Sequence, residues 1–147
     1  MTGLTADDRL AIQELNSRYF YAIDGLTALL PGDPDRHWAE TFAPDGSFSI
    51  VDADGSILMD VQGTDALVEA YRSFPDVATT RHWINDLLIE TDGDDVKSGC
   101  YIIAMNIAAN PAAIVRTGVY RDRLVKGSDG WKFQNRTLIL DPNSPAG

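Results

Sequence analysis

The order of two periodicities along the chain limits its fold more than any other feature. Residues 5–24 have a helical pattern, because Leu15, Tyr19 and Ala22 recur at spacings of four and three after a Thr5 N-cap. The second half instead contains long strand-like segments separated by Asp-Gly and Gly-Ser-Asp-Gly turns. These segments are residues 81–91, 96–108, 114–125 and 131–140. Helices followed by antiparallel strands predict an α+β domain.

Shorter elements complete this pattern. Asp33 as cap and Pro34 at the first helical position predict a short helix through Trp38 and Phe42, closed by a turn at residues 43–46. Residues 47–51 and 57–61 flank an Asp-Ala-Asp-Gly turn and predict a hairpin, and residues 63–74 predict a third helix. Three helices can cover one face of a strongly bent sheet, and a cone-shaped pocket is expected between them.

Length and charge exclude several classes of protein. The chain has 147 residues, of which 44% are apolar, so residues 1–147 are expected to form a single domain with a loose tail at about 142–147. A net charge of -10 and the lack of a basic block argue against nucleic-acid and membrane partners. No leader pattern and no apolar run near the ~18 residues of a membrane span are present, which predicts a cytoplasmic protein.

Metal and cysteine chemistry are not expected from the residue inventory. Cys100 is the one cysteine, and the two histidines, His37 and His82, are far apart in sequence, so no metal-ligand cluster is predicted. Cys100 lies among apolar residues and is interpreted as a small buried side chain that lines the pocket. We expect neither a metal nor a cofactor.

Asp24 and His82 are the candidate catalytic residues. A carboxylate at the end of a helix is disfavoured by the helix dipole, so Asp24 should have a compensating partner. His82 opens the strand 81–91, and an imidazole that is held by a carboxylate is a proton acceptor near neutral pH. The alternatives are an Asp24 that bonds the following loop and a His82 that is a hydrogen-bonded core residue.

Other side chains are candidates for binding or charge stabilisation. Arg136, inside the cone, is expected to stabilise negative charge, whereas Arg116, Arg121 and Arg123 are expected to be solvated or ion-paired. The predicted substrate-binding residues, each with a core role as the alternative, are Phe20, Tyr21, Trp38, Phe42, Ile84, Cys100, Tyr101, Ala104 and Met105.

Five segments in a fixed order carry a family resemblance from about Leu4 to Asp141. They are AIQELNSRYFYAID, FAPDGSF, RHWINDLLIE followed by DGDDV, GVYRDRLV and DGWKFQNRTL. With them the sequence resembles the SnoaL-like group of the NTF2-like superfamily. The resemblance implies a cone in which three N-terminal helices pack on a strongly curved, mostly antiparallel sheet. It also implies self-association as a homodimer or homotrimer.

The resemblance extends to scytalone dehydratase and hexachlorocyclohexane dehydrochlorinase, in which an aspartate late in the first helix holds a strand histidine. The matching positions are Asp24 and His82, and the dehydrochlorinase arginine that follows Trp-Lys-Phe matches Arg136. This implies a cofactor-independent lyase, isomerase or cyclase that acts on a small hydrophobic, cyclic metabolite, with Tyr21 or Tyr101 assisting. The dehydratase differs in carrying its histidine on the strand that holds Cys100 here. The alternative is a non-catalytic ligand-binding protein or the small subunit of a ring-hydroxylating dioxygenase-like assembly.

Overall fold

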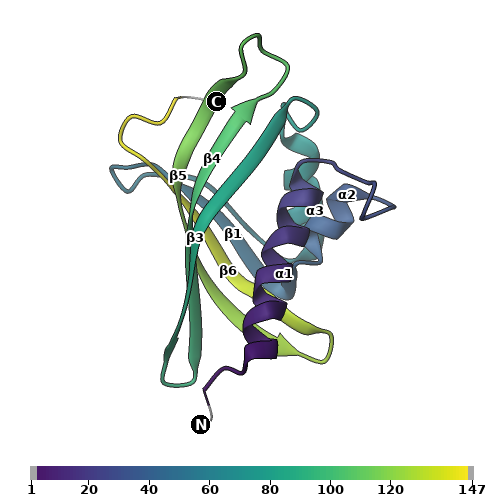
Figure 1. Ribbon diagram of the computed structural model, residues 1–147, viewed down its shortest axis with the longest axis vertical. Helices are drawn as coiled ribbons and strands as arrows, with labels where there is room; N and C mark the ends of the chain where they lie inside the picture. Colours follow the sequence, from purple (N-terminus) through teal and green to yellow (C-terminus); the bar gives the residue numbers. More distant parts are fainter. Residues whose placement is uncertain (1–2, 146–147) are drawn as a thin grey trace.

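Three helices pack on one side of a curved six-stranded sheet in the computed structural model, which describes residues 3–145 (Figure 1). The elements are α1 Ala6–Ile23, α2 Pro34–Ala39, β1 Phe42–Val51, β2 Ile57–Gln62, α3 Thr64–Ser73, β3 Thr80–Asp92, β4 Asp95–Asn106, β5 Ala113–Gly127 and β6 Gly130–Leu140. The strand order is β2-β1-β6-β5-β4-β3, with β1 and β6 parallel and the other neighbours antiparallel. The predicted α+β class and curved, mostly antiparallel sheet are confirmed.

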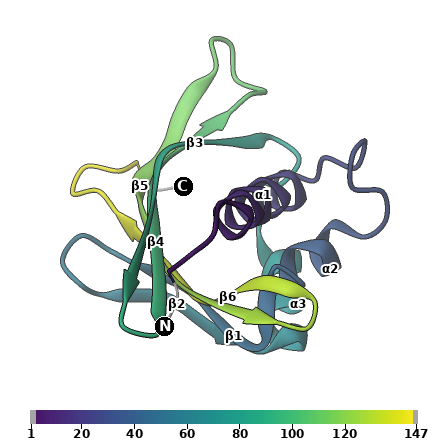
Figure 2. The ribbon, with the colours of Figure 1, turned by 60° about the horizontal axis from the view of Figure 1, so that its bottom comes forward.

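Helix α1 begins and ends where local chemistry requires. The Thr5 hydroxyl accepts from the Asp8 N–H and the Asp8 carboxylate accepts from the Thr5 N–H, which caps the first turn. At the other end Asp24 is the C-cap, and Gly25 follows with φ of 67°, a left-handed conformation that favours glycine. The helix lies in the hollow of the sheet (Figure 2). Its end therefore brings Asp24 to the concave face of the sheet.

Phe42 marks a difference from the predicted short helix. Helix α2 ends at Ala39, and Phe42 is already the first residue of β1. The expected turn at residues 43–46 is wrong, because these residues belong to the strand, at a register irregularity between Phe42 and Ser47. A Cβ at Gly46 would lie 2.8 Å from the Phe133 carbonyl oxygen. Residues that are typical of a turn therefore occur here where β1 and β6 approach each other closely.

Strand β3 contains a second irregularity. Asp86 has φ of 58°, and the pairing register with β4 shifts between Asn85 and Leu88. An additional residue reverses the side-chain alternation that follows it. Leu87 and Ile89 therefore pack against the core and Leu88 is exposed, whereas uninterrupted alternation would put Leu88 on the same face as His82.

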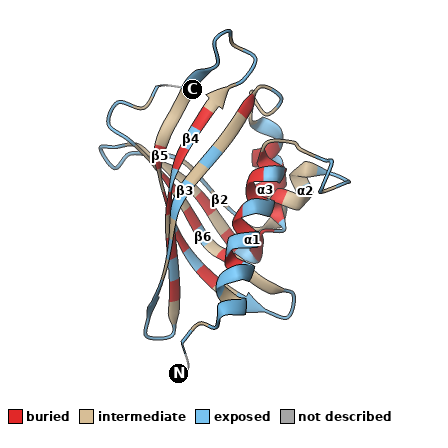
Figure 3. Ribbon diagram, in the orientation of Figure 1, coloured by how far each residue is buried: buried red, intermediate tan, exposed pale blue. Residues whose placement is uncertain are grey.

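Buried side chains concentrate where α1 and α3 face the sheet, and exposed residues lie at the hairpin ends and outer surfaces (Figure 3). The expected tail is attached further than predicted, because the Thr117 N–H donates to the Ser144 hydroxyl and the Asp141 N–H donates to the Thr117 carbonyl. Residues 146 and 147 of that expected tail lie outside the described residues. Within residues 3–145, none of the helices has the length and apolar character needed to span a membrane.

Candidate active site

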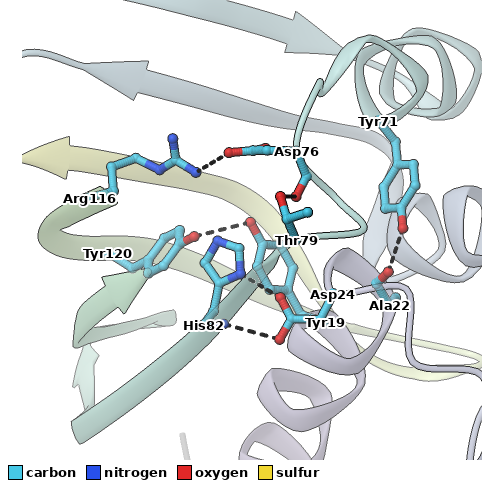
Figure 4. Close-up of polar contacts among 9 residues, drawn as sticks. All are labelled: Tyr19, Ala22, Asp24, Tyr71, Asp76, Thr79, His82, Arg116 and Tyr120. Carbon is cyan, nitrogen blue, oxygen red and sulfur yellow. Dashed lines mark hydrogen bonds and ion pairs between the residues drawn. The ribbon is translucent and has the colours of Figure 1, made fainter. Parts of the chain in front are cut away.

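Asp24 and His82, 58 positions apart in sequence, are in direct contact. One Asp24 carboxylate oxygen lies 2.5 Å from Nδ1 of His82, and the other accepts from the His82 backbone N–H at 3.1 Å (Figure 4). Their side chains are 4% and 9% exposed. A carboxylate that binds both the ring and the backbone of one histidine fixes the position and the rotation of the ring.

This contact determines which imidazole nitrogen is available for chemistry. An ionised carboxylate only accepts hydrogen bonds, so Nδ1 of His82 carries a proton and donates to Asp24. In the neutral ring Nε2 is then the acceptor, and it makes no hydrogen bond with residues 3–145. The Phe20 ring packs against the imidazole with centroids 5.9 Å apart. His82 is thus oriented with a free basic nitrogen.

His82 lines a cavity of about 200 Å³ between the concave face of the sheet and the segment that joins α3 to β3. Most of its wall is apolar, with polar groups at a few positions. The apolar lining residues are Ile23, Phe48, Ile50, Met59, Phe74, Pro75, Val77 and Leu138, and the polar ones are Asp76, Thr80, His82, Arg116 and Tyr120. A mainly apolar pocket with a few polar groups is typical of a small-molecule site.

Strand pairing arranges two of these polar groups around a space. His82 of β3 pairs with Ala104 of β4, and Ala104 pairs with Arg116 of β5. Two strand spacings separate the backbones of His82 and Arg116 by roughly 10 Å. The Ala104 side chain between them is small and fully buried. His82 and Arg116 therefore lie in one row across three strands, and both line the same cavity.

Tyr120 adds a hydroxyl to the same wall. Its oxygen lies 3.5 Å from the Tyr19 hydroxyl oxygen, as Figure 4 shows. Burial, together with the neighbouring Tyr19, raises the pKa of Tyr120 well above its usual value, and Arg136 only partly opposes this effect. The hydroxyl is therefore a proton donor at neutral pH rather than a phenolate.

Arg116 is held loosely. Its Nη2 lies 3.7 Å from an Asp76 carboxylate oxygen, and the two side chains are 23% and 34% exposed. The Asp76 backbone is fixed, because its carbonyl accepts from the N–H groups of Thr79 and Thr80. The ion pair lies at the cavity wall, and both partners have access to water.

Arg136 lies elsewhere than its predicted role requires. It is fully buried outside the cavity lining, with Nε 3.1 Å from Asp122 and Nη2 donating to Asn16 at 2.8 Å. The rings of Tyr19 and Tyr120 lie 4.2 and 4.0 Å from its guanidinium carbon. Although burial by itself lowers the pKa of Arg136, Asp122 and the tyrosines raise it above its usual value. The residue is a permanent buried cation that supports the wall from behind.

The structure places the predicted lining residues outside the cavity wall. Trp38 and Phe42 are core residues with ring centroids 5.3 Å apart, because Phe42 begins β1 beneath α2. Tyr21 and Tyr101 are 40% and 55% exposed. The remaining five are buried or half-buried beside the site or within the core: Phe20, Ile84, Cys100, Ala104 and Met105.

Cys100 also has no reactive setting. Its sulfur is 3.7 Å from Nη2 of Arg136, and burial raises the pKa of its thiol to about 11. Within residues 3–145, no three of the His, Cys, Asp and Glu side chains form a group that could hold a metal ion.

Sequence reasoning missed Arg116 and Tyr120 as parts of the wall. Both lie on the inner face of β5, at even spacing from the buried Asp122. The sequence shows that Arg116, Tyr120 and Asp122 share one face of this strand, but it does not show that this face points inward. The apolar residues from β1, β2 and the segment after α3 could be assigned only once the sheet was seen to curve around them.

A family model described as "SnoaL-like domain" matches residues 4–137 of the chain. Among solved structures, a protein of unknown function from Mycobacterium tuberculosis is 29% identical, with a TM-score of 0.73 over 92% of this chain and 72% of that one. A Nostoc punctiforme protein of unknown function with a cystatin-like fold is 21% identical, with a TM-score of 0.77 over 98% of both chains.

A third similar structure is the beta subunit of a proposed aromatic-ring-hydroxylating dioxygenase from Novosphingobium aromaticivorans. It is 20% identical, with a TM-score of 0.72 over 90% of this chain and 88% of that one. A comparison with curated proteins gave no match. The solved structures therefore support the fold, and a single family is matched along almost the whole chain.

Proposed function

The chain belongs to the SnoaL-like domain family, and we propose that within this family it is a cofactor-independent acid/base enzyme that moves a proton on a small hydrophobic, cyclic metabolite. The observation that carries the proposal is the contact between Asp24 and Nδ1 of His82 at the wall of an apolar cavity. A buried histidine with only a core role would not need a free ring nitrogen beside such a space.

His82 is the base in this mechanism. Its Nε2 removes a proton from a substrate carbon, and the electron pair of the broken C–H bond stays on the substrate. Asp24 accepts the Nδ1–H hydrogen bond throughout and stabilises the imidazolium that forms. The same electron pair then expels a leaving group, or the imidazolium returns the proton at another atom. The first outcome is a lyase reaction and the second an isomerase or cyclase reaction.

Tyr120 stabilises the charge that develops on the substrate. Burial keeps its hydroxyl protonated, so it can donate to an oxygen that gains negative charge. Arg136 supports this role indirectly, since its guanidinium packs on the Tyr120 ring and fixes it against the cavity. Arg136 is therefore proposed as a positioning residue.

A non-catalytic assembly subunit is the second candidate function. It is favoured by the similarity to the proposed dioxygenase beta subunit and by exposed apolar side chains on the outer strands, such as Trp83, Tyr101 and Ile103. The same side chains are the proposed contact surface of a cytoplasmic homodimer or homotrimer. A protein of this kind would bind through the sheet and leave the cavity without chemistry.

Proton exchange at carbon tests the enzymatic proposal without knowledge of the natural reaction. Single-ring ketones such as cyclohexanone are incubated in D2O, and loss of the α-hydrogen signal is followed by proton NMR. His82→Gln should reduce the catalysed exchange at least ~100-fold, because general-base catalysis contributes about 100- to 10,000-fold. His37→Gln is the matched control, since His37 contacts the Pro31 carbonyl away from this cavity.

Two results would contradict the proposal. One is exchange that persists in a folded His82→Gln variant, and the other is the lack of catalysed exchange in the wild type across the ring ketones. An independent check is the ¹⁵N spectrum of the His82 ring, in which Nδ1 should carry the proton in neutral solution. The opposite tautomer would leave Nε2 unable to act as the base.

A further inference from the structure

Arg116 and Asp76 form an ion pair that differs from the other arginine pairs of this protein. Its N–O distance is 3.7 Å, whereas Arg72–Asp35 and Arg123–Asp95 are each joined at 2.8 Å. Arg116 makes no side-chain hydrogen bond with the described residues, although a guanidinium has five N–H donors. Its donors therefore have no hydrogen-bond partner among the described residues, at the wall of a mainly apolar cavity.

The position of Arg116 allows these donors to bind a ligand in the cavity. It lines the same cavity as His82 and lies two strands away from it across Ala104. Among the described residues that line the cavity, Arg116 is the one permanent cation, because eight are apolar and Thr80 and Tyr120 are neutral. An anion that enters this space with a ring attached can reach one positive group, which lies two strands away from His82.

Cavity size limits the ligand. An apolar cavity of about 150 Å³ holds benzene, and this one measures about 200 Å³. It has space for one six-membered ring with a small substituent. A carboxylate matches the planar fork of one arginine, whereas a phosphate dianion would need further cations that the lining lacks.

Asp76 can give way to such a ligand. Its backbone is held by Thr79 and Thr80, but its side chain is 34% exposed and bound only loosely to Arg116. A displaced Asp76 carboxylate moves into water, so it is not left buried without a partner. The ion pair is then a closed state of the cavity that an anionic ligand opens by exchange.

We propose that the cavity selects a single-ring carboxylate, whose carboxylate replaces Asp76 on Arg116 and whose ring extends toward His82. This inference rests on the proposed function because it names the substrate class of the same site. Arg116 is thereby a specificity-determining residue, and Asp76 is a built-in competitor that weakens binding of the anion.

Binding of benzoate and of its neutral analogue benzamide tests the inference, with the His82 ring resonances followed by NMR during each titration. Wild type should bind benzoate more tightly than benzamide. Arg116→Gln should lower the affinity for benzoate at least ~10-fold, because hydrogen bonds to charged groups contribute about that factor or more. The same variant should change the affinity for benzamide less than about twofold. Asp76→Asn should tighten benzoate by about threefold or more, since it removes the competitor.

The control is Arg123→Gln, which breaks a surface ion pair on the same strand and should leave both affinities unchanged. Equal affinities for benzoate and benzamide, the absence of benzoate binding, or tighter binding of benzylamine would each overturn the inference. Asp76→Asn guards against misfolding of Arg116→Gln, because a gain of affinity cannot come from an unfolded site. His82→Gln, in which binding is followed by the proton resonances of benzoate itself, should retain benzoate binding while losing proton exchange. Failure of this inference is therefore distinguishable from failure of the proposed function.

Discussion

Two buried acid–base pairs lie near α1, and they differ in what faces them. Asp24–His82 joins the end of α1 to β3, whereas Asp122–Arg136 joins the neighbouring strands β5 and β6. Asp24 and His82 meet 2.5 Å apart at a cavity wall, whereas Asp122 and Arg136 meet 3.1 Å apart with both side chains fully buried. A histidine can exist without charge, but an arginine cannot lose its proton in a protein. The first pair can therefore change its protonation during a reaction, and the second can only hold a fixed charge.

The surroundings of each pair match this difference. Nη1 of Arg136 has no hydrogen-bond partner among residues 3–145, and its Nε–H is poorly aligned with Asp122, so the contact is an ion pair alone. Aromatic faces supply the remaining stabilisation, with the Phe133 ring 4.3 Å away. Asp122 also accepts from Ser98 at 2.7 Å. Aromatic rings, Ser98 and Asn16 thus surround this pair, whereas Nε2 of His82 faces the cavity without a hydrogen bond to residues 3–145.

Arg136→Ala should have the largest effect on stability. It leaves Asp122 as a buried carboxylate without its cation, which costs about 3–5 kcal/mol in comparable pairs. Urea denaturation followed by circular dichroism measures the loss. Arg123→Ala, which breaks an exposed pair, should cost less than about 1 kcal/mol. The comparison fails if both variants lose the same amount of stability.

Asp24→Asn should affect the reaction far more than the fold. Without the carboxylate the His82 imidazolium loses its partner, and we expect proton exchange to fall about 100-fold, or ~2.7 kcal/mol of barrier. The free energy of unfolding should fall by only about 1 kcal/mol, because neither residue is left as an unpaired charge. A loss of several kcal/mol with normal exchange would place this pair in the same structural class as Asp122 and Arg136.

Tyr71→Phe should produce the smallest effect. The Tyr71 hydroxyl donates to the Ala22 carbonyl at 2.8 Å, close to Asp24, so its removal should cost about 1 kcal/mol. Burial raises the pKa of Tyr71 to about 12 from an ordinary 10.0. Between these values the unfolded chain loses the proton first, so wild-type stability should fall as the pH rises from about 10 to 12.

Denaturant titrations at several pH values test whether the free energy of unfolding falls in this range. The loss of stability with rising pH should be smaller in Tyr71→Phe than in wild type. Tyr19 and Tyr120, whose pKa values burial also raises, contribute to the pH dependence that remains. A wild-type stability that rises in this range would contradict the assignment. Exchange by Tyr71→Phe should stay close to that of wild type, because Tyr71 does not line the cavity with His82.

Sequence patterns predicted the elements well where local chemistry decides them. The Thr5 cap, the end of α1 near Asp24 and the turns after Asp92 and Gly127 occur as expected. The predictions failed where a tertiary contact overrides a local signal. At residues 43–46, residues that are typical of a turn lie within β1. At Asp86, a positive φ and a register shift reverse the side-chain alternation of β3.

The same division holds for the site. By itself the sequence determined the α+β class and selected Asp24 and His82, because a helix-terminal acid needs a partner and few residues can supply one. Only the tertiary structure decided between two inward-facing arginines. Arg136 lies beneath α1, where Asn16 and Tyr19 cover it, whereas Arg116 lies at the cavity wall in the row of His82. Strand register and sheet curvature set these rows, and they depend on contacts between residues far apart in the chain.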